Sequence, residues 1–115
     1  MSRKVHYLDL LEGFEHRPHL EQVYILQRLH RLQPTETPPL EYLDVSISLG
    51  LLNKADVVGD VREALDTQGV RFEVQEYKRL LWSRVRFRIY LDDWRDLMVY
   101  LAVEQSLRKY VEAAA

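Results

Sequence analysis

Apolar and polar residues alternate in two runs between residues 70 and 90. The apolar positions of these runs are Val70, Phe72, Val74, Val85, Phe87 and Ile89. Arg84, Arg86 and Arg88 occupy the intervening positions of the second run. A period of two places alternate residues on opposite faces of a strand. The pattern therefore predicts a β-hairpin over residues 70–91, with an apolar underside and a basic outer face.

Apolar residues at helical spacing surround this hairpin. They predict N-terminal helices within residues 1–33, a helix over residues 54–68 that Gly69 ends, and a long C-terminal helix over residues 92–115. The polar, proline-rich stretch that follows the N-terminal helices reads as a connector. The chain is thus expected to be one α+β domain, mostly helical, with a single hairpin.

Residues 40–50 fit two patterns. Thr37 before Pro38 and Pro39 is a strong helix start, because a side-chain cap is followed by prolines where no amide donor is needed. We therefore favour a helix that Gly50 ends. The stretch from residue 42 to 49 also alternates apolar and polar residues, which is a strand pattern. The strand remains the alternative.

The composition describes an ordinary globular protein. Of the 115 residues, 47% are hydrophobic and 30% are charged, and the net charge is −2. The absence of cysteine excludes disulfides and thiolate metal sites. No leader sequence and no run long enough to cross a bilayer is recognised, so we expect a cytoplasmic protein without a membrane partner.

Charge is segregated along the chain. Residues 70–91 carry six basic and two acidic side chains, whereas residues 40–69 carry two basic and six acidic ones. The hairpin is therefore a basic island that follows an acidic helix. A local field of this kind matters more for binding than the total charge does.

The C-terminal helix is apolar at every position from residue 97 to 103. A surface helix needs only one apolar stripe, so this segment is expected to be buried on more than one side. Either the rest of the monomer or a second subunit covers it, and in a chain this small we favour the second subunit. We expect a homodimer whose contacts include Leu97, Met98, Tyr100 and Leu101.

Residues 38–90 resemble a winged helix-turn-helix domain. Ser48-Leu49-Gly50-Leu51 is similar to the end of the first helix of that motif, and the spacing Val58-x-x-Val61-x-x-x-Leu65-x-x-x-Gly69-Val70 is similar to its second helix and the entry to the wing. The resemblance implies a helix-turn-helix within residues 37–69 and contact with nucleic acid. Two departures weigh against a groove-reading helix. The segment between Gly50 and Val58 is longer than the motif's turn, and the second helix is lined with acids that would repel phosphates, namely Asp56, Asp60, Glu63 and Asp66.

If residues 42–49 are a strand, the element order becomes strand, helix, strand, strand, helix. That order is a ferredoxin-like half-fold, in which helices cover one side of a small sheet. Both topologies leave the basic face of the hairpin in solvent.

The basic face is the candidate binding site. Its members, for nucleic acid or a partner, are Tyr77, Lys78, Arg79, Trp82, Arg84, Arg86 and Arg88. Arginines can neutralise phosphates, and the two aromatic rings can stack on bases. The simpler interpretation is a solvated sheet face in which Glu73 pairs with Arg86 or Arg88, or which a neighbouring acidic helix covers.

Leu80, Leu81 and Trp82 place large apolar side chains at the expected hairpin tip. They are either an anchor for a protein partner or a loop folded back onto the core. His16 and His19 suggest a metal pair, but Pro18 separates them across a helix boundary, so an ordinary surface loop is expected instead. No nucleophile motif or glycine-rich phosphate loop is present, so no enzyme, cofactor or metal is expected. The leading hypothesis is a small regulatory protein that contacts a nucleic-acid backbone. The alternative is a protein-interaction adaptor or inhibitor.

Overall fold

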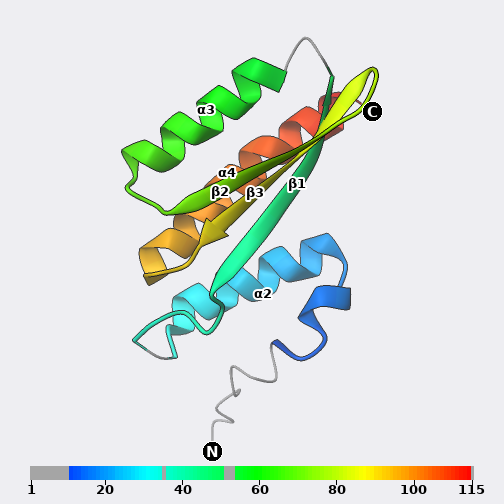
Figure 1. The fold of residues 1–115 in the computed structure, drawn as a ribbon. Helices are drawn as coiled ribbons and strands as arrows, with labels where there is room; N and C mark the ends of the chain where they lie inside the picture. The colour runs from blue at the N-terminus through cyan, green and yellow to red at the C-terminus, as the bar shows by residue number, and fades with distance from the viewer. Residues whose placement is uncertain (1–10, 35, 51–53, 115) are drawn as a thin grey trace, which may run out of the picture.

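A computed structural model of the chain describes residues 11–34, 36–50 and 54–114, with side chains through Arg108. Within these described ranges, seven elements follow one another (Figure 1). They are a 3-10 turn η1 (Phe14–His16), helix α2 (His19–Leu32), strand β1 (Tyr42–Gly50), helix α3 (Lys54–Thr67), strands β2 (Phe72–Lys78) and β3 (Trp82–Tyr90), and helix α4 (Trp94–Ala114). The expected α+β class, the hairpin and the long C-terminal helix are confirmed.

The three strands form one antiparallel sheet in the order β1-β3-β2. Strand β3 is central, so Phe87 lies opposite Val45 of β1 and Val74 of β2. Along β3 the side chains of Val85, Phe87 and Ile89 are buried, and the arginines between them point to the other face. The alternation of apolar and polar residues in the sequence of β3 thus corresponds to the alternation of buried and exposed side chains in the sheet.

The favoured helix over residues 40–50 is wrong, because these residues contain strand β1. A helix would have spread the alternate apolar residues around its whole circumference. As a strand paired with β3, the segment buries all four of them on one face, namely Leu43, Val45, Ile47 and Leu49. This burial outweighs the local capping signal at Thr37. Residues 37–69 therefore hold a strand and one helix where a helix-turn-helix requires two helices.

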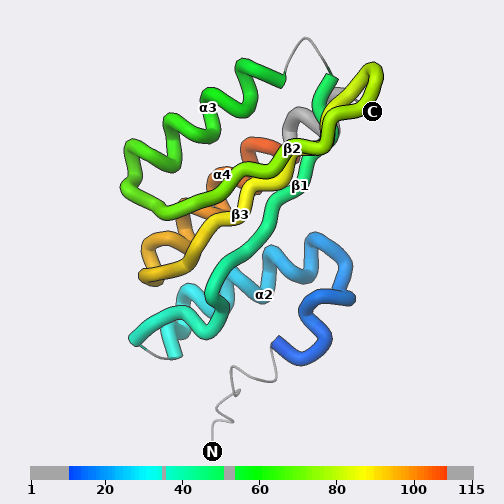
Figure 2. The backbone as a smooth tube through the Cα atoms, in the orientation of Figure 1, coloured from blue at the N-terminus to red at the C-terminus, as the bar shows by residue number. Residues whose placement is uncertain are grey.

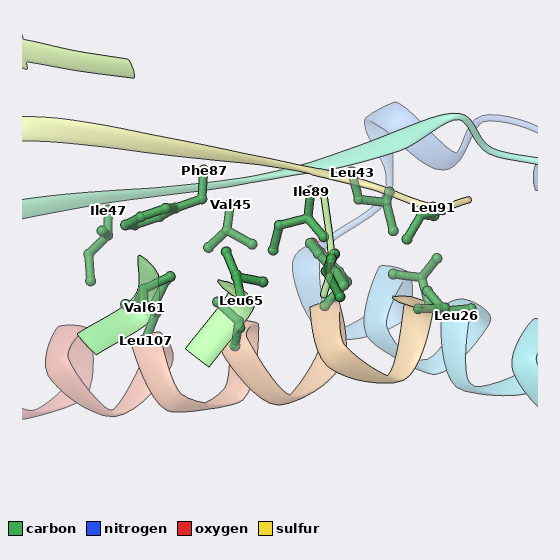
Figure 3. Close-up of a cluster of buried hydrophobic side chains, with 14 of the residues drawn as sticks. Leu26, Leu43, Val45, Ile47, Val61, Leu65, Phe87, Ile89, Leu91 and Leu107 are labelled. Atoms are coloured by element: carbon green, nitrogen blue, oxygen red, sulfur yellow. The ribbon is translucent and has the colours of Figure 1, made fainter. Parts of the chain in front are cut away.

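The long helices of the described residues, α2, α3 and α4, all lie on the same face of the sheet (Figures 1 and 2). Helix α4 runs under the sheet between α2 and α3, and the side chains of β1 and β3 point down toward it (Figure 3). Val61 and Leu65 enter this core from α3, and Leu26 enters it from α2. The strand, helix, strand, strand, helix order of the alternative topology is the one that the chain adopts.

Gly69 ends helix α3 as the sequence predicts. Its φ of 68° is the left-handed conformation that glycine adopts without strain. The amide of Val70 donates to the carbonyl of Leu65, and the amide of Gly69 donates to that of Asp66, both at 3.1 Å. These two hydrogen bonds satisfy carbonyls at the end of the helix, and the chain then continues into β2.

The N-terminal helix is attached to α4 through a buried carboxylate. Glu104 is only 3% exposed, and its Oε1 accepts hydrogen bonds from Nε of Arg108 at 3.1 Å and from Nη2 of Arg108 at 2.6 Å. The same oxygen bonds Nε2 of His19, the first residue of α2. His19 therefore has a structural contact with α4 where the sequence predicts an ordinary surface loop.

Replacing Glu104 with alanine is expected to lower the free energy of unfolding by about 1–3 kcal/mol, because Arg108 and His19 lose their shared acceptor. Urea denaturation followed by circular dichroism measures the change. The exposed neighbour Gln105, changed to alanine, serves as the control and should move stability by less than about 0.5 kcal/mol. Equal effects of the two substitutions would show that Glu104 does not secure the helix pair.

The expected dimer contacts are wrong at two of their four residues. Leu97 and Tyr100 are buried within the single chain, and the hydroxyl of Tyr100 reaches the carbonyl oxygen of Asp44 at 3.5 Å. Burial raises the pKa of Tyr100 well above its ordinary value. Leu101 is partly buried against the core, and Met98 is half exposed. The sheet thus supplies much of the burial that the apolar run needs.

Candidate functional site

The face of the sheet on which none of the described helices packs is lined by polar and aromatic side chains. We call it the open sheet face. From β1 it contains Tyr42, Asp44, Ser46 and Ser48; from β3, Trp82, Arg84, Arg86, Arg88 and Tyr90; and from β2, Glu73, Gln75 and Tyr77. Because β3 is central, each arginine has one neighbour on either side. Arg88 lies between Asp44 and Glu73, Arg86 between Ser46 and Gln75, and Arg84 between Ser48 and Tyr77.

At the end of this face away from the hairpin tip, Arg88 is neutralised. Its Nε and Nη2 donate to the two carboxylate oxygens of Asp44, at 3.0 and 3.2 Å. Its guanidinium also lies over the ring of Tyr42, at 4.0 Å from the ring centre. The bond to Asp44 raises the pKa of Arg88 above its already high value. A paired and stacked arginine of this kind is a structural contact rather than a free phosphate binder.

Arg71 and Asp92 form a second pair at the same end of the sheet. Nη2 and Nε of Arg71 donate to the carboxylate of Asp92 at 2.9 and 3.3 Å, and this bond raises the pKa of Arg71. The guanidinium stacks on Tyr90 at 4.2 Å. Desolvation, followed by a hydrogen bond with Glu73, raises the pKa of Tyr90. This half of the face is internally satisfied.

The half of the face nearer the tip is different, because its arginines contact no carboxylate among the described residues. Nη2 of Arg86 donates to Oε1 of Gln75, while its Nε is shielded from solvent and has no partner in the described part of the chain. Arg84 makes no ion pair with any described residue and stands between Ser48 and Tyr77. A recess of about 430 Å³ adjoins Arg86 on the side of the paired half and is lined by Glu73, Val74, Gln75, Arg86 and Arg88. Within the described residues, the arginines of this face that contact no carboxylate are therefore Arg84 and Arg86.

The hairpin tip extends this basic region. The amide of Arg79 donates to the carbonyl of Trp82 at 2.9 Å and closes the turn. Leu80 is 90% exposed and Leu81 is 73% exposed, so the tip does not fold back onto the core. Lys78 and Arg79 are exposed beside them and form no ion pair with a described residue.

Acidic helix α3 does not cover the arginines, because it packs on the opposite face of the sheet (Figure 1). Lys54, the first residue of α3, forms an ion pair with Glu76 of β2 at 3.0 Å. Glu76 points to the helix-covered face, since it lies opposite the buried Val85. The interpretation in which a neighbouring acidic helix screens the arginine face is therefore wrong.

The structure divides the candidate residues into two groups. Five of them gather around the tip half of the open sheet face, namely Tyr77, Arg79, Trp82, Arg84 and Arg86; Lys78 lies opposite the buried Ser83 and so belongs to the other face, and Arg88 is tied to Asp44. Ser46 and Ser48, which flank the free arginines, were missed because β1 was read as a helix. The strand alternation over residues 42–49 contains the signal that would have found them.

The structure holds no metal-like cluster within its described ranges: no three His, Asp or Glu side chains there come together as ligands. Nor does any described helix combine the length and apolar character that spanning a bilayer requires. Comparison of the chain with models of known protein families, with curated proteins and with solved structures finds no match.

Proposed function

We propose that the tip half of the open sheet face binds single-stranded nucleic acid, and that the chain acts as a non-enzymatic regulatory protein. The observation that carries this proposal is the setting of Arg84 and Arg86. Both lie on the central strand, on the face that no described helix covers, and neither contacts a carboxylate within the described residues. A free guanidinium in such a place matches the geometry of a phosphate.

The residues around these arginines supply the other contacts that a single strand uses. The rings of Tyr77 and Trp82 are each nearly half exposed, and both are large enough to stack on a base. The hydroxyls of Ser46 and Ser48 line one side of the arginine column and can donate to phosphate oxygens. Arg79 adds charge at the tip.

A single strand fits this surface better than a duplex does. None of the described helices protrudes from the open sheet face to enter a major groove, and helix α3 is acidic and lies on the opposite face. Stacking on Tyr77 or Trp82 requires unpaired bases, which only single strands and loops offer. The tip half of the sheet therefore acts as an electrostatic and stacking platform without a sequence-reading element.

The test is a salt titration of binding to a fluorescently labelled single-stranded oligonucleotide. Three cations without acidic partners among the described residues, Arg79, Arg84 and Arg86, are expected to give a slope of log K against log salt of about −2, since each phosphate contact contributes about −0.7. A duplex of the same sequence should bind more weakly. Absence of binding at low salt, or binding that salt does not weaken, would contradict the proposal.

A second candidate function is docking of the tip on an acidic, apolar protein surface. The exposure of Leu80 and Leu81 favours it, because stacking and phosphate contact need neither side chain. In this case Trp82 and the leucines are the anchor, and the arginines pair with carboxylates of the partner.

Changing Leu80 and Leu81 together to serine separates the two candidates. If the chain binds nucleic acid, the double variant should retain its oligonucleotide affinity within about twofold, because the phosphate-contacting charges are unchanged. Fluorescence anisotropy measures this affinity. Stability should change by less than about 0.5 kcal/mol, since both side chains are exposed. If the tip is a protein anchor, a partner captured by the wild type is lost with the variant.

A further inference from the structure

The outer surface of the helical layer carries exposed apolar residues at its centre and opposite charges at its two sides. Helix α4 lies between α2 and α3 (Figure 1). The outward row of α2 contains Leu20, which is 69% exposed, and Tyr24, which is 56% exposed. Met98 of α4 is 50% exposed beside Ala102. These apolar side chains lie on the surface opposite the open sheet face, so the proposed nucleic-acid site does not use them.

Two grooves separate the three helices. The groove between α3 and α4 has a volume of about 700 Å³, and Val61, Ala64 and Val99 are among its lining residues. The groove between α2 and α4 has a volume of about 630 Å³ and is lined in part by Tyr24 and Met98. The surface is therefore ridged, with an apolar floor in each groove, as helix packing between two molecules requires.

The two outer helices carry complementary charge. Near the end of α2, Arg28 and Arg31 form no ion pair with a described residue. At the corresponding positions near the end of α3, Glu63 and Asp66 likewise form no ion pair with a described residue. One helical face of a single chain thus presents unpaired arginines on one side and unpaired carboxylates on the other.

We infer that this face binds a second copy of the chain, with a two-fold axis parallel to α4 between the two helical layers. Such an axis exchanges the two sides of the layer, so α2 of one copy lies over α3 of its partner, and α4 lies over α4. A two-fold axis across α4 in the same plane would instead place α3 over α3, with like charges opposed. Only the first arrangement is electrostatically complementary.

The arginines of α2 and the carboxylates of α3 also lie at the same level along the direction of α4. His30 of α2 contacts the ring of Trp94 at 6.5 Å between centroids, and Arg95 donates to the carbonyl of Gln68, after the end of α3, at 3.0 Å. Both outer helices therefore end beside the first turn of α4. Rotation about an axis parallel to α4 preserves these levels. Arg28 and Arg31 of one copy then face Glu63 and Asp66 of the partner, and the reverse contact forms by symmetry.

The size of the interface sets its expected strength. Three helices of about 1.5 Å rise per residue and about 10 Å spacing present on the order of 600 Å² per copy, which is at the small end for a specific interface. A dissociation constant in the micromolar range is expected, on the order of 10 µM. The dimer leaves both open sheet faces outward, on opposite sides of the assembly.

Sedimentation equilibrium of the full chain with charge-reversal variants tests the inference. Arg28→Glu with Arg31→Glu, and separately Glu63→Arg with Asp66→Arg, should each weaken association by at least about tenfold, since like charges then oppose each other at two symmetry-related places. Combining all four substitutions should restore association to within about threefold of the wild type, because opposite charges face each other again. Reversal of Arg79 at the remote tip is the control and should have no effect. Circular dichroism confirms that each variant is folded.

Each result of the sedimentation experiment either supports or contradicts the inferred dimer. A wild-type chain that remains monomeric up to about 1 mM would overturn the inference, because an interface of this size would be almost fully formed at that concentration. Association that neither reversal weakens would place the contact elsewhere on the surface. Weakening by both single-helix reversals without recovery in the combined variant would show that α2 and α3 do not face each other. Recovery supports the proposed arrangement.

Discussion

Replacing Phe87 with alanine is expected to lower the free energy of unfolding by about 3–5 kcal/mol, because the substitution removes a large buried side chain and leaves a cavity. Phe87 is fully buried at the middle of the central strand, opposite Val45 and Val74. A domain of this length has a stability of roughly 5–15 kcal/mol in total, so the loss is a large fraction of it.

Urea denaturation with tryptophan fluorescence measures the effect as a shift in midpoint with an unchanged slope. The matched control is Leu80→Ala, which removes a comparable apolar side chain from an exposed site and should change stability by less than about 0.5 kcal/mol. A loss below about 1 kcal/mol for Phe87→Ala would mean that β3 is not the centre of the core.

Replacing Arg84 and Arg86 together with alanine is expected to weaken binding of a single-stranded oligonucleotide at low salt by on the order of a hundredfold, because two phosphate contacts are lost. The salt slope should become shallower by about 1.4, which is twice the contribution of one phosphate contact. Folding should be little affected, because Arg84 has no charged partner among the described residues and Arg86 makes one side-chain bond, to Gln75. Fluorescence anisotropy at several salt concentrations gives both quantities.

Local patterns in the sequence predict those elements whose signals are complete within the element. The hairpin follows from the alternation around Val85 and Phe87, and the end of α3 follows from Gly69, which adopts the expected left-handed conformation. The assignment of residues 42–49 depended on two competing local signals. Pairing with β3 makes this segment a strand. The paired residues are more than thirty positions apart in the sequence, so a local capping signal carries no information about the pairing.

The division of the arginines into paired and free groups could not be predicted for the same reason. Arg88 is neutralised by Asp44, which lies beside it only because β1 is a strand next to β3. Arg88 and Asp44 are 44 positions apart in the sequence. The sequence pattern instead indicated the nearer acid Glu73 as a partner of Arg86 or Arg88. The candidate site is thus smaller than the arginine pattern suggested. It is centred on Arg84 and Arg86.

The apolar run of α4 illustrates how one pattern combines several environments. Leu97, Tyr100 and Val103 are buried in the core of the single chain. Met98 remains half exposed, and it lines both interhelical grooves. The sequence correctly indicated burial on more than one side. The sequence could not predict which of these residues are buried by the sheet, which by the flanking helices and which by a second copy.

The most direct test of the nucleic-acid proposal compares two double variants of equal net charge in the same anisotropy titration. Arg84→Ala with Arg86→Ala removes the two free cations of the open sheet face. Arg17→Ala with Arg62→Ala removes the same amount of charge from the segment before α2 and from α3, neither of which belongs to the strands that form that face. We predict that the first variant loses on the order of a hundredfold in affinity for a single-stranded oligonucleotide and the second less than about threefold, because the phosphates contact the sheet face rather than the protein at large. Equal losses in the two variants, or full binding by the first, would contradict the proposed site.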